Sequence, residues 1–514
     1  MQLLDEIQSG FYCSNYRRDY KSHLVPFLLS SHVSLLCNPD SLYSSKQVFI
    51  YVKLLPSIRI IILFNNILSN NNILLGKFSY SVRRKTMRRD YIDTGYSPKD
   101  TDLVCEFHIE PSAGVNFEEA ATHMAGESSI DSWTEIVTLS PELAAKLKPH
   151  VFYVNEEAQT VRVAYSEELF ELGSVPQVLS AVAGNILSMK VVDNLRLQDI
   201  AFPKPMLREF RGPKFGLPGI RELTGVQDRP LIGTIVKPKV GLTSEKHAEV
   251  AYNSFAGGCD LVKDDENLTD QKFNGFERRA KFTLKLAEKA ESETGERKMY
   301  LCNITAPTCK EMIRRMNILK DLGASYAMVD VVPAGWTALQ TLREEAEDIG
   351  LALHAHRCMH SAYTRNPRHG ISMLVVAKLC RLIGLDQLHI GTVVGKMHGE
   401  KHEVLALRDE CVLDKVPADE SQHVLAQDWG GLKPMFPVAS GGLAPTMIPD
   451  LYAIFGKDVI MQFGGGIHAH PMGTAAGATA CRQALEAALK GVSLQEYAKN
   501  HKELEVALDK WMKK

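Results

Sequence analysis

The sequence predicts an α/β protein in which an N-terminal α+β domain is followed by a (β/α)₈ barrel. From about residue 212 onward, eight short runs of apolar and β-branched residues alternate with segments of helical periodicity. Polar side chains and glycines gather where these runs end, which is where barrels of this class carry their catalytic groups. A chain of 514 residues can hold a barrel of about 250 residues and at least one further domain.

Residues 1–86 differ from the rest of the chain in composition. They hold ten lysines and arginines against four acids, and Lys53, Pro56 and Arg59 interrupt their apolar runs before these reach the length of a membrane-spanning helix. They also lack the basic start, apolar middle and small-residue cleavage site of a secretory signal. We expect that this leader is not part of the working fold and that Met87 is the natural start; a membrane anchor is the alternative.

Residues 87–211 are predicted to form the α+β domain. Residues 102–111 alternate like a strand, and residues 116–128 show helical periodicity with acids in the first turn. Residues 160–170 have the pattern of a strand that enters a loop. From spacing alone, no catalytic motif stands out in this domain.

Residues 212–514 contain the predicted barrel and C-terminal helices. The predicted strands are 230–239, 259–266, 299–304, 326–332, 351–357, 387–396, 435–442 and 459–466. Between several of them lie predicted helices with apolar residues at i, i+3 and i+4 and glycine at the end, namely 244–258, 276–295, 310–323 and 371–384. Eight strands that alternate with helices are typical of a closed (β/α)₈ barrel.

The side chains that could carry chemistry fall at the carboxyl ends of six of these runs. They are Lys237 and Lys239 in the first, Lys263, Asp265 and Glu266 in the second, His354, His356 and Arg357 in the fifth, His389 and Lys396 in the sixth, Ser440, Gly441 and Gly442 in the seventh, and Gly464, Gly465 and Gly466 in the eighth. Glycines at the last two ends let backbone N–H groups approach a phosphate. Each motif alone also fits a turn, a core histidine or an exposed strand exit. Their convergence favours an enzyme for a small sugar with two phosphates.

The sequence Lys-Asp-Asp-Glu at residues 263–266 is the most informative of these motifs. Side chains alternate along an extended segment, so Lys263 and Asp265 are expected to point the same way, with Glu266 just beyond. Adjacent carboxylates repel one another unless a cation lies among them, and Mg²⁺ typically takes one or two carboxylates with water and substrate oxygens. The motif therefore predicts a magnesium site, with a solvated loop as the structural alternative.

Residues from about 90 to the C-terminus resemble the large subunit of ribulose-1,5-bisphosphate carboxylase/oxygenase (RuBisCO), most closely the archaeal form III type of methanogens. The motifs that carry the resemblance are AGESSIDSW (125–133), GTIVKPKVGL (233–242), GGCDLVKDDEN (257–267), LHAHRCMH (353–360), HIGTVVGKMHGE (389–400), VASGG (438–442) and QFGGG (462–466). The resemblance implies a carbon–carbon lyase that adds CO₂, or O₂ in a side reaction, to the enediolate of ribulose 1,5-bisphosphate. The product with CO₂ is 3-phosphoglycerate, and the implied setting is AMP and nucleotide salvage.

The resemblance also implies roles for individual residues. Lys263 reacts with an activator CO₂ to form a carbamate, which binds Mg²⁺ with Asp265 and Glu266. The carbamate or Lys237 removes the C3 proton, and Lys237 protonates the final carbanion. His356 assists hydration, and Lys396 holds the incoming carboxylate from a mobile lid. Substrate contacts are implied for Lys239, Arg357, His389, Ser440, Gly441, Gly442, Gln462, Gly464 and Gly465, and for Glu127, Ser132, Trp133 and Asn185 from the N-terminal domain of a neighbouring subunit.

Two positions depart from the plant-type pattern of this family. Ser132 stands in place of a threonine and keeps the hydroxyl, so we expect phosphate binding to survive. Ile235 stands in place of another threonine. That substrate contact is therefore either displaced to Thr234 or absent from the site.

The composition narrows the possible partners. A formal net charge of −2 gives no electrostatic basis for binding nucleic acid or an anionic membrane. Ten scattered cysteines without a C-x-x-C pair indicate reduced thiols in a cytoplasmic enzyme. We expect a homodimer or larger homo-oligomer with shared active sites and no small subunit. The alternatives are a RuBisCO-like enolase or isomerase of sulfur salvage, which typically lacks the lid lysine, and a non-catalytic sugar-phosphate-binding or assembly protein, against which the intact metal triad counts.

Overall fold

The computed structural model describes residues 91–132, 136–394 and 401–512, together with the backbone of four strands between residues 34 and 84. The chain divides into two compact units, 1–88 and 89–514. In the first unit, β1 (Ser34–Leu36), β2 (Gln47–Leu55), β3 (Ile58–Asn65) and β4 (Ser79–Arg84) pair in that order as an antiparallel sheet. That residues 1–86 lie outside the working fold stays a prediction.

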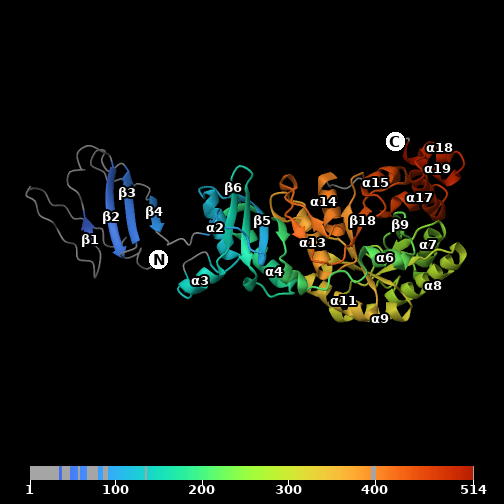
Figure 1. Ribbon diagram of the computed structural model, residues 1–514, viewed down its shortest axis with the longest axis horizontal. Coiled ribbons are helices and arrows are strands. Elements are labelled where there is room, and N and C mark those ends of the chain that lie inside the picture. The colour runs from blue at the N-terminus through green and yellow to red at the C-terminus, as the bar shows by residue number, and fades with distance from the viewer. Residues whose placement is uncertain are drawn as a thin grey trace, which may run out of the picture. The chain divides into compact units, whose positions relative to one another are not determined.

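A closed barrel of eight parallel strands forms the centre of the second unit's larger part (Figure 1). Its strands are β9 (Leu231–Ile235), β10 (Leu261–Lys263), β11 (Met299–Asn303), β12 (Tyr326–Asp330), β13 (Ala352–His356), β15 (Gln387–Gly391), β18 (Phe436–Ser440) and β19 (Ile460–Phe463). The principal helices around and after them are α7 (Ser244–Ala256), α8 (Phe276–Thr294), α9 (Cys309–Asp321), α11 (Trp336–Ile349), α13 (Met373–Ile383), α14 (Lys401–Val412), α15 (Ile448–Phe455), α17 (Thr474–Leu489), α18 (Leu494–Ala498) and α19 (Lys502–Trp511). The predicted (β/α)₈ barrel, or TIM barrel, is confirmed.

The predicted strands were too long at their carboxyl ends. The first ends at Ile235 rather than at residue 239, the second at Lys263 rather than 266, and the sixth at Gly391 rather than 396. No turn signal separates the last paired residue from the residues that follow, so the pattern alone does not mark the last strand pair. These extra residues form the loops at the mouth of the barrel.

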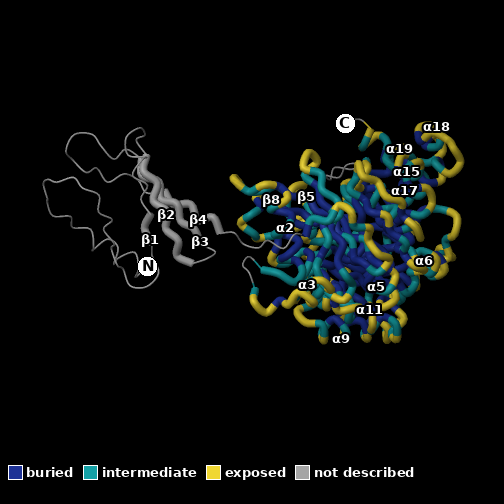
Figure 2. The backbone as a smooth tube through the Cα atoms, turned by 60° about the vertical axis from the view of Figure 1, so that its left-hand side comes forward, coloured by how far each residue is buried: buried dark blue, intermediate teal, exposed yellow. Residues whose placement is uncertain are grey.

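Alternation along the strands separates a dry lower interior from a polar mouth. A core inside the amino end of the barrel contains Leu231, Leu261, Met299, Leu301, Tyr326, Met328, Ala352, Phe436, Val438 and Ile460, together with Ile220 of α6 (Gly216–Thr224). Farther along the same faces come Lys263, Asp330, His356 and Ser440, because side chains repeat every second residue. Figure 2 shows the buried backbone at the centre of this unit and the exposed segments at its periphery.

Local sequence explains where several barrel helices begin and end. The side chain of Thr243 accepts a hydrogen bond from the third residue of α7, and Thr308 does the same for Glu311 in α9, which satisfies N–H groups that lack helical partners. Helices α8 and α11 end at Gly295 and Gly350, whose φ angles are +71° and +85°. Glycine adopts this left-handed conformation without the penalty of a Cβ.

The N-terminal domain is a mixed sheet with helices. The sheet order is β14-β8-β5-β7-β6, formed by β5 (Asp102–Pro111), β6 (His150–Asn155), β7 (Thr160–Ser166), β8 (Val192–Ala201) and β14 (Gly370–Ile371). Helices α2 (Phe117–Glu127), α3 (Pro141–Leu147) and α4 (Val175–Val182) accompany it. The strand predicted at 102–111 and the helix predicted at 116–128 are confirmed, whereas β6 and β8 were not predicted. Because β14 comes from the barrel part of the chain, the sheet joins the two parts.

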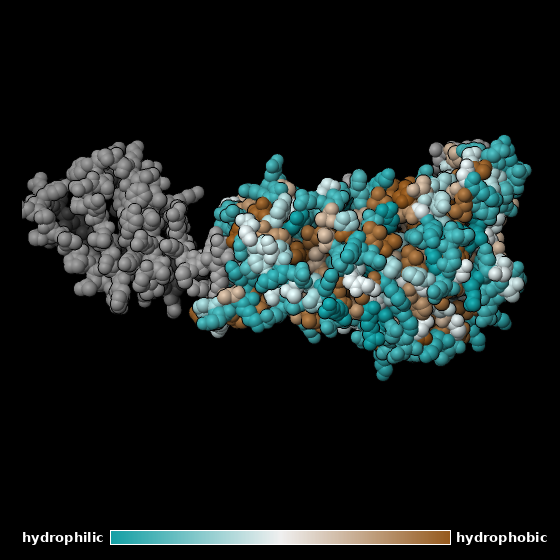
Figure 3. All heavy atoms as spheres, in the orientation of Figure 1, coloured by the Kyte–Doolittle hydropathy of each residue, from teal (hydrophilic) through white to brown (hydrophobic). Residues whose placement is uncertain are grey.

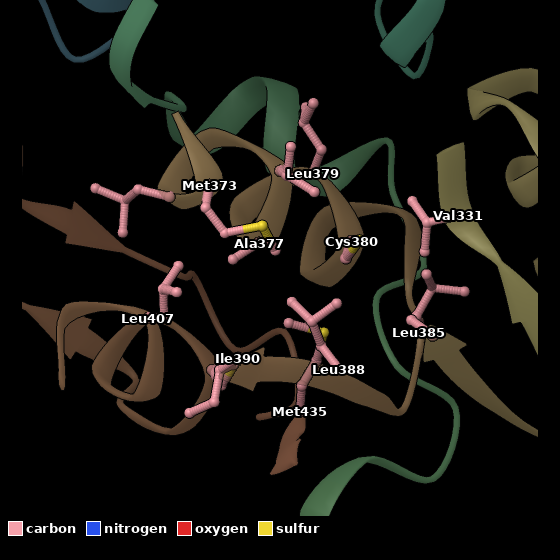
Figure 4. Close-up of a cluster of buried hydrophobic side chains, with 14 of the residues drawn as sticks. Val331, Met373, Ala377, Leu379, Cys380, Leu385, Leu388, Ile390, Leu407 and Met435 are labelled. Carbon is pink, nitrogen blue, oxygen red and sulfur yellow. The ribbon is translucent and has the colours of Figure 1, made fainter. Parts of the chain in front are cut away.

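Helix α13 packs between the barrel and neighbouring elements, and all its residues are buried. Figure 4 shows Met373, Ala377 and Cys380 of this helix gathered with Leu388 of β15 and Leu407 of α14. Cys380 is a buried free thiol that fills space in this cluster. Lys378 and Arg381 are the two charged residues of α13, and both are buried.

Lys378 is the centre of a buried ionic triad. Its Nζ donates to Oδ2 of Asp199 in β8 at 2.7 Å and lies 3.2 Å from Oε1 of Glu410 in α14, and none of the three side chains is exposed. Burial raises the pKa of Glu410 to about 7, although the charge of Lys378 opposes that shift. The triad ties the N-terminal sheet to two barrel helices.

Short elements complete the second unit. They are η2 (Glu167–Leu169), η3 (Asn185–Ser188), α5 (Lys204–Arg208), α10 (Val331–Ala334), α12 (Ser361–Thr364), β16 (Lys415–Val416), η4 (Glu420–Gln422), β17 (Gln427–Asp428), η5 (Pro445–Met447) and α16 (Gly465–His468). Hydrophilic residues cover most of the face of this unit that Figure 3 shows. Within the described part of the chain, no helix combines the length and the apolarity that a membrane crossing requires.

Candidate active site

Lys263 ends β10 and lies wholly inside the barrel. Its Nζ donates to the backbone oxygen of Asp264 at 2.7 Å and to Sδ of Met328 at 3.3 Å. Burial lowers the pKa of this amine, although the nearby carboxylates of Glu266 and Asp330 oppose that shift. The site therefore shifts Lys263 toward the neutral amine, which is its nucleophilic form.

Asp264, the first acid after the strand, faces helices α7 and α8. Its fully buried carboxylate accepts hydrogen bonds from Nε of Arg279 at 3.0 Å, from the backbone N–H of Asn303 at 2.9 Å and from the hydroxyl of Tyr300. Burial alone would raise the pKa of Asp264, but the charge of Arg279 and the imidazole of His247 lower it. This anchor holds the turn so that the next two acids face the barrel mouth.

Those two acids each lie beside a lysine from the loop after β9. Nζ of Lys237 is 2.6 Å from Oδ2 of Asp265, and Nζ of Lys239 is 3.4 Å from Oε1 of Glu266. Burial opposes these shifts, but the hydrogen bond from Lys237 lowers the pKa of Asp265, and the imidazole of His356 lowers that of Glu266. Two ionised carboxylates next to a buried amine are a donor set that suits Mg²⁺.

His356, at the end of β13, connects this group to the next strand. Its Nδ1 is 3.0 Å from Oδ1 of Asp330, and its Nε2 is 3.7 Å from Oε2 of Glu266. Burial and the charge of Lys263 lower the pKa of His356, while Asp330 opposes them. A neutral imidazole held between two carboxylates can exchange a proton with a molecule bound at the mouth.

A chain of hydrogen bonds runs from the lower barrel interior to Ser440. Nε2 of Gln387 donates to the hydroxyl of Tyr326 at 3.1 Å. The other amide atom of Gln387, Oε1, therefore accepts a hydrogen bond from Nδ1 of His354 at 2.7 Å. Burial lowers the pKa of His354 to about 3 and that of His389 well below its usual value, so both rings are neutral. Nε2 of His389 then donates to His354 at 2.8 Å, and its Nδ1 accepts from Ser440 at 2.6 Å. The Ser440 oxygen is left as an acceptor, which suits a substrate hydroxyl better than the phosphate oxygen that the resemblance implies.

Glycines keep the mouth open near the predicted phosphate sites. Gly441 and Gly442 have φ angles of +126° and +74°, and a Cβ at Gly465 would meet no atom within 4 Å. A Cβ at Gly391 would lie 2.9 Å from a terminal nitrogen of Arg357. Burial lowers the pKa of Arg357 to about 10, so the guanidinium stays charged at neutral pH and can bind an anion.

Gln462 of β19 points into the barrel, where a Cβ on Gly233 would lie 3.1 Å from its Nε2. Within the described residues, its buried amide nitrogen and oxygen have no hydrogen-bond partner. Such groups are costly to bury unpaired, so both are available to a bound molecule. Gly464, two residues on, would place a Cβ 3.5 Å from Cε of Lys237, which puts the eighth strand beside the first at the mouth.

Five predicted residues are not joined to this group by the structure. Lys396 and Trp133 lie outside the described residues. Glu127 ends α2, Ser132 follows it and Asn185 begins η3. In the described ranges, no hydrogen bond or ion pair links these three to the barrel mouth. Their part in the site stays a prediction.

The alternative left open for Thr234 is resolved. Its hydroxyl is buried, donates to the backbone oxygen of Phe463 at 2.7 Å and lies 3.1 Å from Nε2 of His468. It is therefore used within the barrel wall. The threonine hydroxyl that Ile235 replaces is absent from the mouth.

Two strand ends were overlooked in the sequence. Asp330 ends β12 and orients His356, while Asn303 ends β11 and donates to Oδ2 of Asp330 at 3.2 Å. The other site residues were selected as polar side chains at the carboxyl ends of predicted strands. The same criterion applied to the third and fourth runs would have found Asn303 and Asp330. The partners of Asp264 had no comparable signal, because they lie far along the chain on α7, α8 and β11.

Comparison with known proteins agrees with this geometry. Residues 216–511 match the catalytic domain of the ribulose bisphosphate carboxylase large chain, and residues 90–206 match the N-terminal domain of the same chain. The protein therefore belongs to the RuBisCO large-chain family.

Within that family it is similar to the enzymes of methanogenic archaea. It is 92% identical over 428 residues to the ribulose bisphosphate carboxylase of Methanosarcina barkeri (strain Fusaro / DSM 804), a match that covers 83% of this chain and 100% of that protein. It is 50% identical over 429 residues to that of Methanocaldococcus jannaschii, covering 82% and 100%. A solved structure described as dimeric archaeal Rubisco from Hyperthermus butylicus superposes with a TM-score of 0.78 at 45% identity and covers 82% of this chain and 98% of the other.

Proposed function

We propose that this protein is a ribulose-bisphosphate carboxylase that joins CO₂ to C2 of the enediolate of ribulose 1,5-bisphosphate. Water then adds at C3, the C2–C3 bond breaks, and two molecules of 3-phosphoglycerate result. The observation that carries the proposal is the buried amine of Lys263 beside Asp265 and Glu266 at the mouth of the barrel. The 92% identity to a protein named ribulose bisphosphate carboxylase supports the same activity.

Lys263 is the residue that activates the site. Its neutral amine adds to a CO₂ that is not the substrate, loses a proton and becomes an anionic carbamate. The carbamate, Asp265 and Glu266 would hold Mg²⁺, which when bound supplies a Lewis acid for the enediolate oxygens. Carbamylation converts the buried amine into the third oxygen ligand.

The neighbouring residues handle protons and the incoming gas. Lys237, 2.6 Å from Asp265, protonates C2 of the final carbanion. His356, whose Nδ1 is 3.0 Å from Asp330, assists hydration at C3. Lys396 holds the new carboxylate. O₂ competes for the same enediolate, because a small apolar gas offers no strong directional bond by which the site could reject it.

The two phosphates bind to two groups of residues. Arg357, His389 and Ser440 bind one phosphate, and the Ser440 oxygen also accepts from a sugar hydroxyl. Gly442, Gly464, Gly465 and Lys396 bind the other. Backbone N–H groups at the glycines and the Arg357 guanidinium are suitable donors to phosphate oxygens.

The preferred test is a carboxylation assay in which Mg²⁺ and bicarbonate are added either before the substrate or together with it. Protein preincubated with Mg²⁺ and bicarbonate should fix labelled CO₂ into 3-phosphoglycerate at once, whereas protein started without preincubation should show a lag. Lys263→Ala should fix no CO₂ with or without preincubation. Lys272→Ala, the same change at an exposed position nearby, should behave like the wild type in both assays. Enolisation without carboxylation in the wild type would instead support the enolase of sulfur salvage.

A shared site across a homodimer is part of the proposal. It is supported by the position of Glu127 in the N-terminal domain and by relatives described as dimeric and octameric. Heterodimers of Glu127→Gln and Lys263→Ala chains should regain activity, because one of their two sites combines an intact N-terminal domain with an intact barrel. Absence of rescue in purified heterodimers contradicts the shared site.

The activity needs only residues from 87 onward, in the domains 87–211 and 212–514. The family matches, which begin at residue 90, support this. A chain that starts at Met87 should equal the full chain in turnover per site. We further propose that the substrate arises in AMP salvage and that the enzyme acts in the cytoplasm without a small subunit, nucleic acid or membrane.

A further inference from the structure

Three potential metal ligands of different chemistry meet at the ends of two adjacent barrel strands. Asp330 ends β12, His356 ends β13 in register with it, and Cys358 lies two residues farther on in the following turn. One ligand atom from each of the three lies within 4.8 Å of the other two. The carboxylate, imidazole and thiol therefore converge on one small volume.

The surroundings hold two of these groups in place. Asp330 is 2% exposed, accepts a hydrogen bond from Nδ2 of Asn303 at 3.2 Å and lies 3.0 Å from Nδ1 of His356. Cys358 is half-buried, and the chemistry proposed above gives its sulfur no task. The described cysteines other than Cys309 and Cys358 are fully buried, so Cys358 is one of two described thiols with some exposure.

We propose that Asp330, His356 and Cys358 form a second metal site, which binds Zn²⁺ or a cation of similar softness. One thiolate, one imidazole and one carboxylate are all ligands that zinc accepts, and three protein ligands leave a fourth position for water. In a tetrahedral zinc site the ligand atoms lie roughly 3.3–3.7 Å apart, given bonds of about 2.0–2.3 Å. A pair at the 4.8 Å limit would close by about 1 Å, which rotation of the Cys358 side chain on its turn can supply.

Sulfur is what separates this site from the magnesium site. Mg²⁺ prefers oxygen ligands and octahedral geometry, and Asp265 with a carbamylated Lys263 offers oxygen alone. Zinc binding at Cys358 breaks the S–H bond, forms a sulfur–metal bond and releases the proton to water. No oxidant or further reactant is needed.

Occupancy of this second site blocks carboxylation, because the metal holds the imidazole of His356 away from proton transfer. The inhibition rests on the role proposed for His356 in the carboxylase reaction. Metal binding at Asp330, His356 and Cys358 does not depend on that role, so binding and inhibition can be tested separately.

The first experiment uses Co²⁺, a coloured substitute for Zn²⁺, with the full chain freed of Mg²⁺ and CO₂. A thiolate ligand gives cobalt a charge-transfer band in the near ultraviolet that oxygen and nitrogen ligands do not give. The band should appear in the wild type and in Cys309→Ser, the matched control, and added Zn²⁺ should abolish it. It should be missing in Cys358→Ser and in Cys358→Ala. A wild type without the band, or a Cys358 variant that keeps it, overturns the site.

The second experiment measures carboxylation at saturating Mg²⁺ and CO₂ while Zn²⁺ is added. Cys358→Ser should keep the basal rate and require at least tenfold more Zn²⁺ for half-inhibition than the wild type or Cys309→Ser. Equal inhibition of all three shows that Zn²⁺ acts at the oxygen ligands instead and contradicts the proposal. If the wild type shows no carboxylation at all, the proposed function fails, and the cobalt band still decides the metal site.

Discussion

Replacing Lys378 with methionine should strongly destabilise the protein, because it removes the cation from a buried triad and keeps the hydrocarbon stem. Asp199 and Glu410 would remain without exposed surface and without their cation. Breaking a buried pair by removal of one partner costs about 3–5 kcal/mol. For a unit the size of residues 89–514, the entropy of unfolding is roughly 1 kcal/mol per degree, so the melting temperature should fall by about 3–5 °C.

The pH dependence of this loss has a defined sign. Burial raises the pKa of Glu410 from its ordinary 4.5 to about 7 even with Lys378 present, and removal of Lys378 raises it further. A carboxyl whose folded-state pKa is raised contributes stability that is complete below its unfolded pKa and is lost as the pH rises through the folded pKa. The penalty of Lys378→Met should therefore be largest near pH 8 and smallest near pH 5.

Thermal unfolding of wild type, Lys378→Met and Lys246→Met at one protein concentration provides the measurement. Lys246 pairs with Glu249 on the surface of α7 with a side chain 67% exposed, so its replacement should change stability by less than about 0.5 kcal/mol. A Lys378→Met protein as stable as this control, or one with the same deficit at pH 5 and pH 8, refutes the reasoning.

Three further predictions concern the site and its supports. Asp264→Asn leaves the buried guanidinium of Arg279 without its carboxylate, so the free energy of unfolding should fall by about 3 kcal/mol. The folded fraction should also be activated less by Mg²⁺, and unchanged activation contradicts the anchoring role. Gly384→Ala places a Cβ 2.0 Å from the backbone oxygen of Gly212 at φ +111°. It should lower the free energy of unfolding by well over the roughly 1–2 kcal/mol expected for Gly350→Ala, whose Cβ meets nothing within 4 Å. Equal melting temperatures for the two variants argue against the close approach. Ser440→Ala should lower kcat/KM for the bisphosphate by about 10–100-fold through the lost hydroxyl contact, whereas Ser421→Ala on the surface should not, and equal kinetics for the two exclude Ser440 from substrate binding.

The barrel could be predicted because its signal is local. Apolar strands buried on both faces, such as Leu231–Ile235 and Ala352–His356, are conspicuous as short runs between amphipathic helices. The strand β6 was missed although its Val-Phe-Tyr-Val run favours a strand, and β8 was missed because Asp193, Asn194 and Asp199 interrupt its apolar pattern. Pairing of β6 with β7 and of β8 with β5 fixes their places in the sheet.

In the candidate site, too, some features follow from the local sequence and others only from the tertiary structure. The order of residues determined that Lys263, Asp265 and Glu266 stand together at a strand end, since backbone geometry confines neighbours in sequence to a few ångströms. Only the tertiary structure decided that Asp264 turns outward to Arg279 and Tyr300. The direction of a side chain depends on which partner offers the stronger bond, and those partners come from distant segments.

By itself, the sequence determined the barrel, the glycines at the ends of its last two strands and the group formed by Lys263, Asp265 and Glu266, because these follow from short-range periodicity and residue type. The closure of the barrel brings together Asp330, His356 and Cys358, and it links Ser440 through His389 and His354 to Gln387. It also buries Lys378 between Asp199 and Glu410. Contacts of this kind are set by folding, since they join residues that are neighbours only once the strands have paired and the helices have packed.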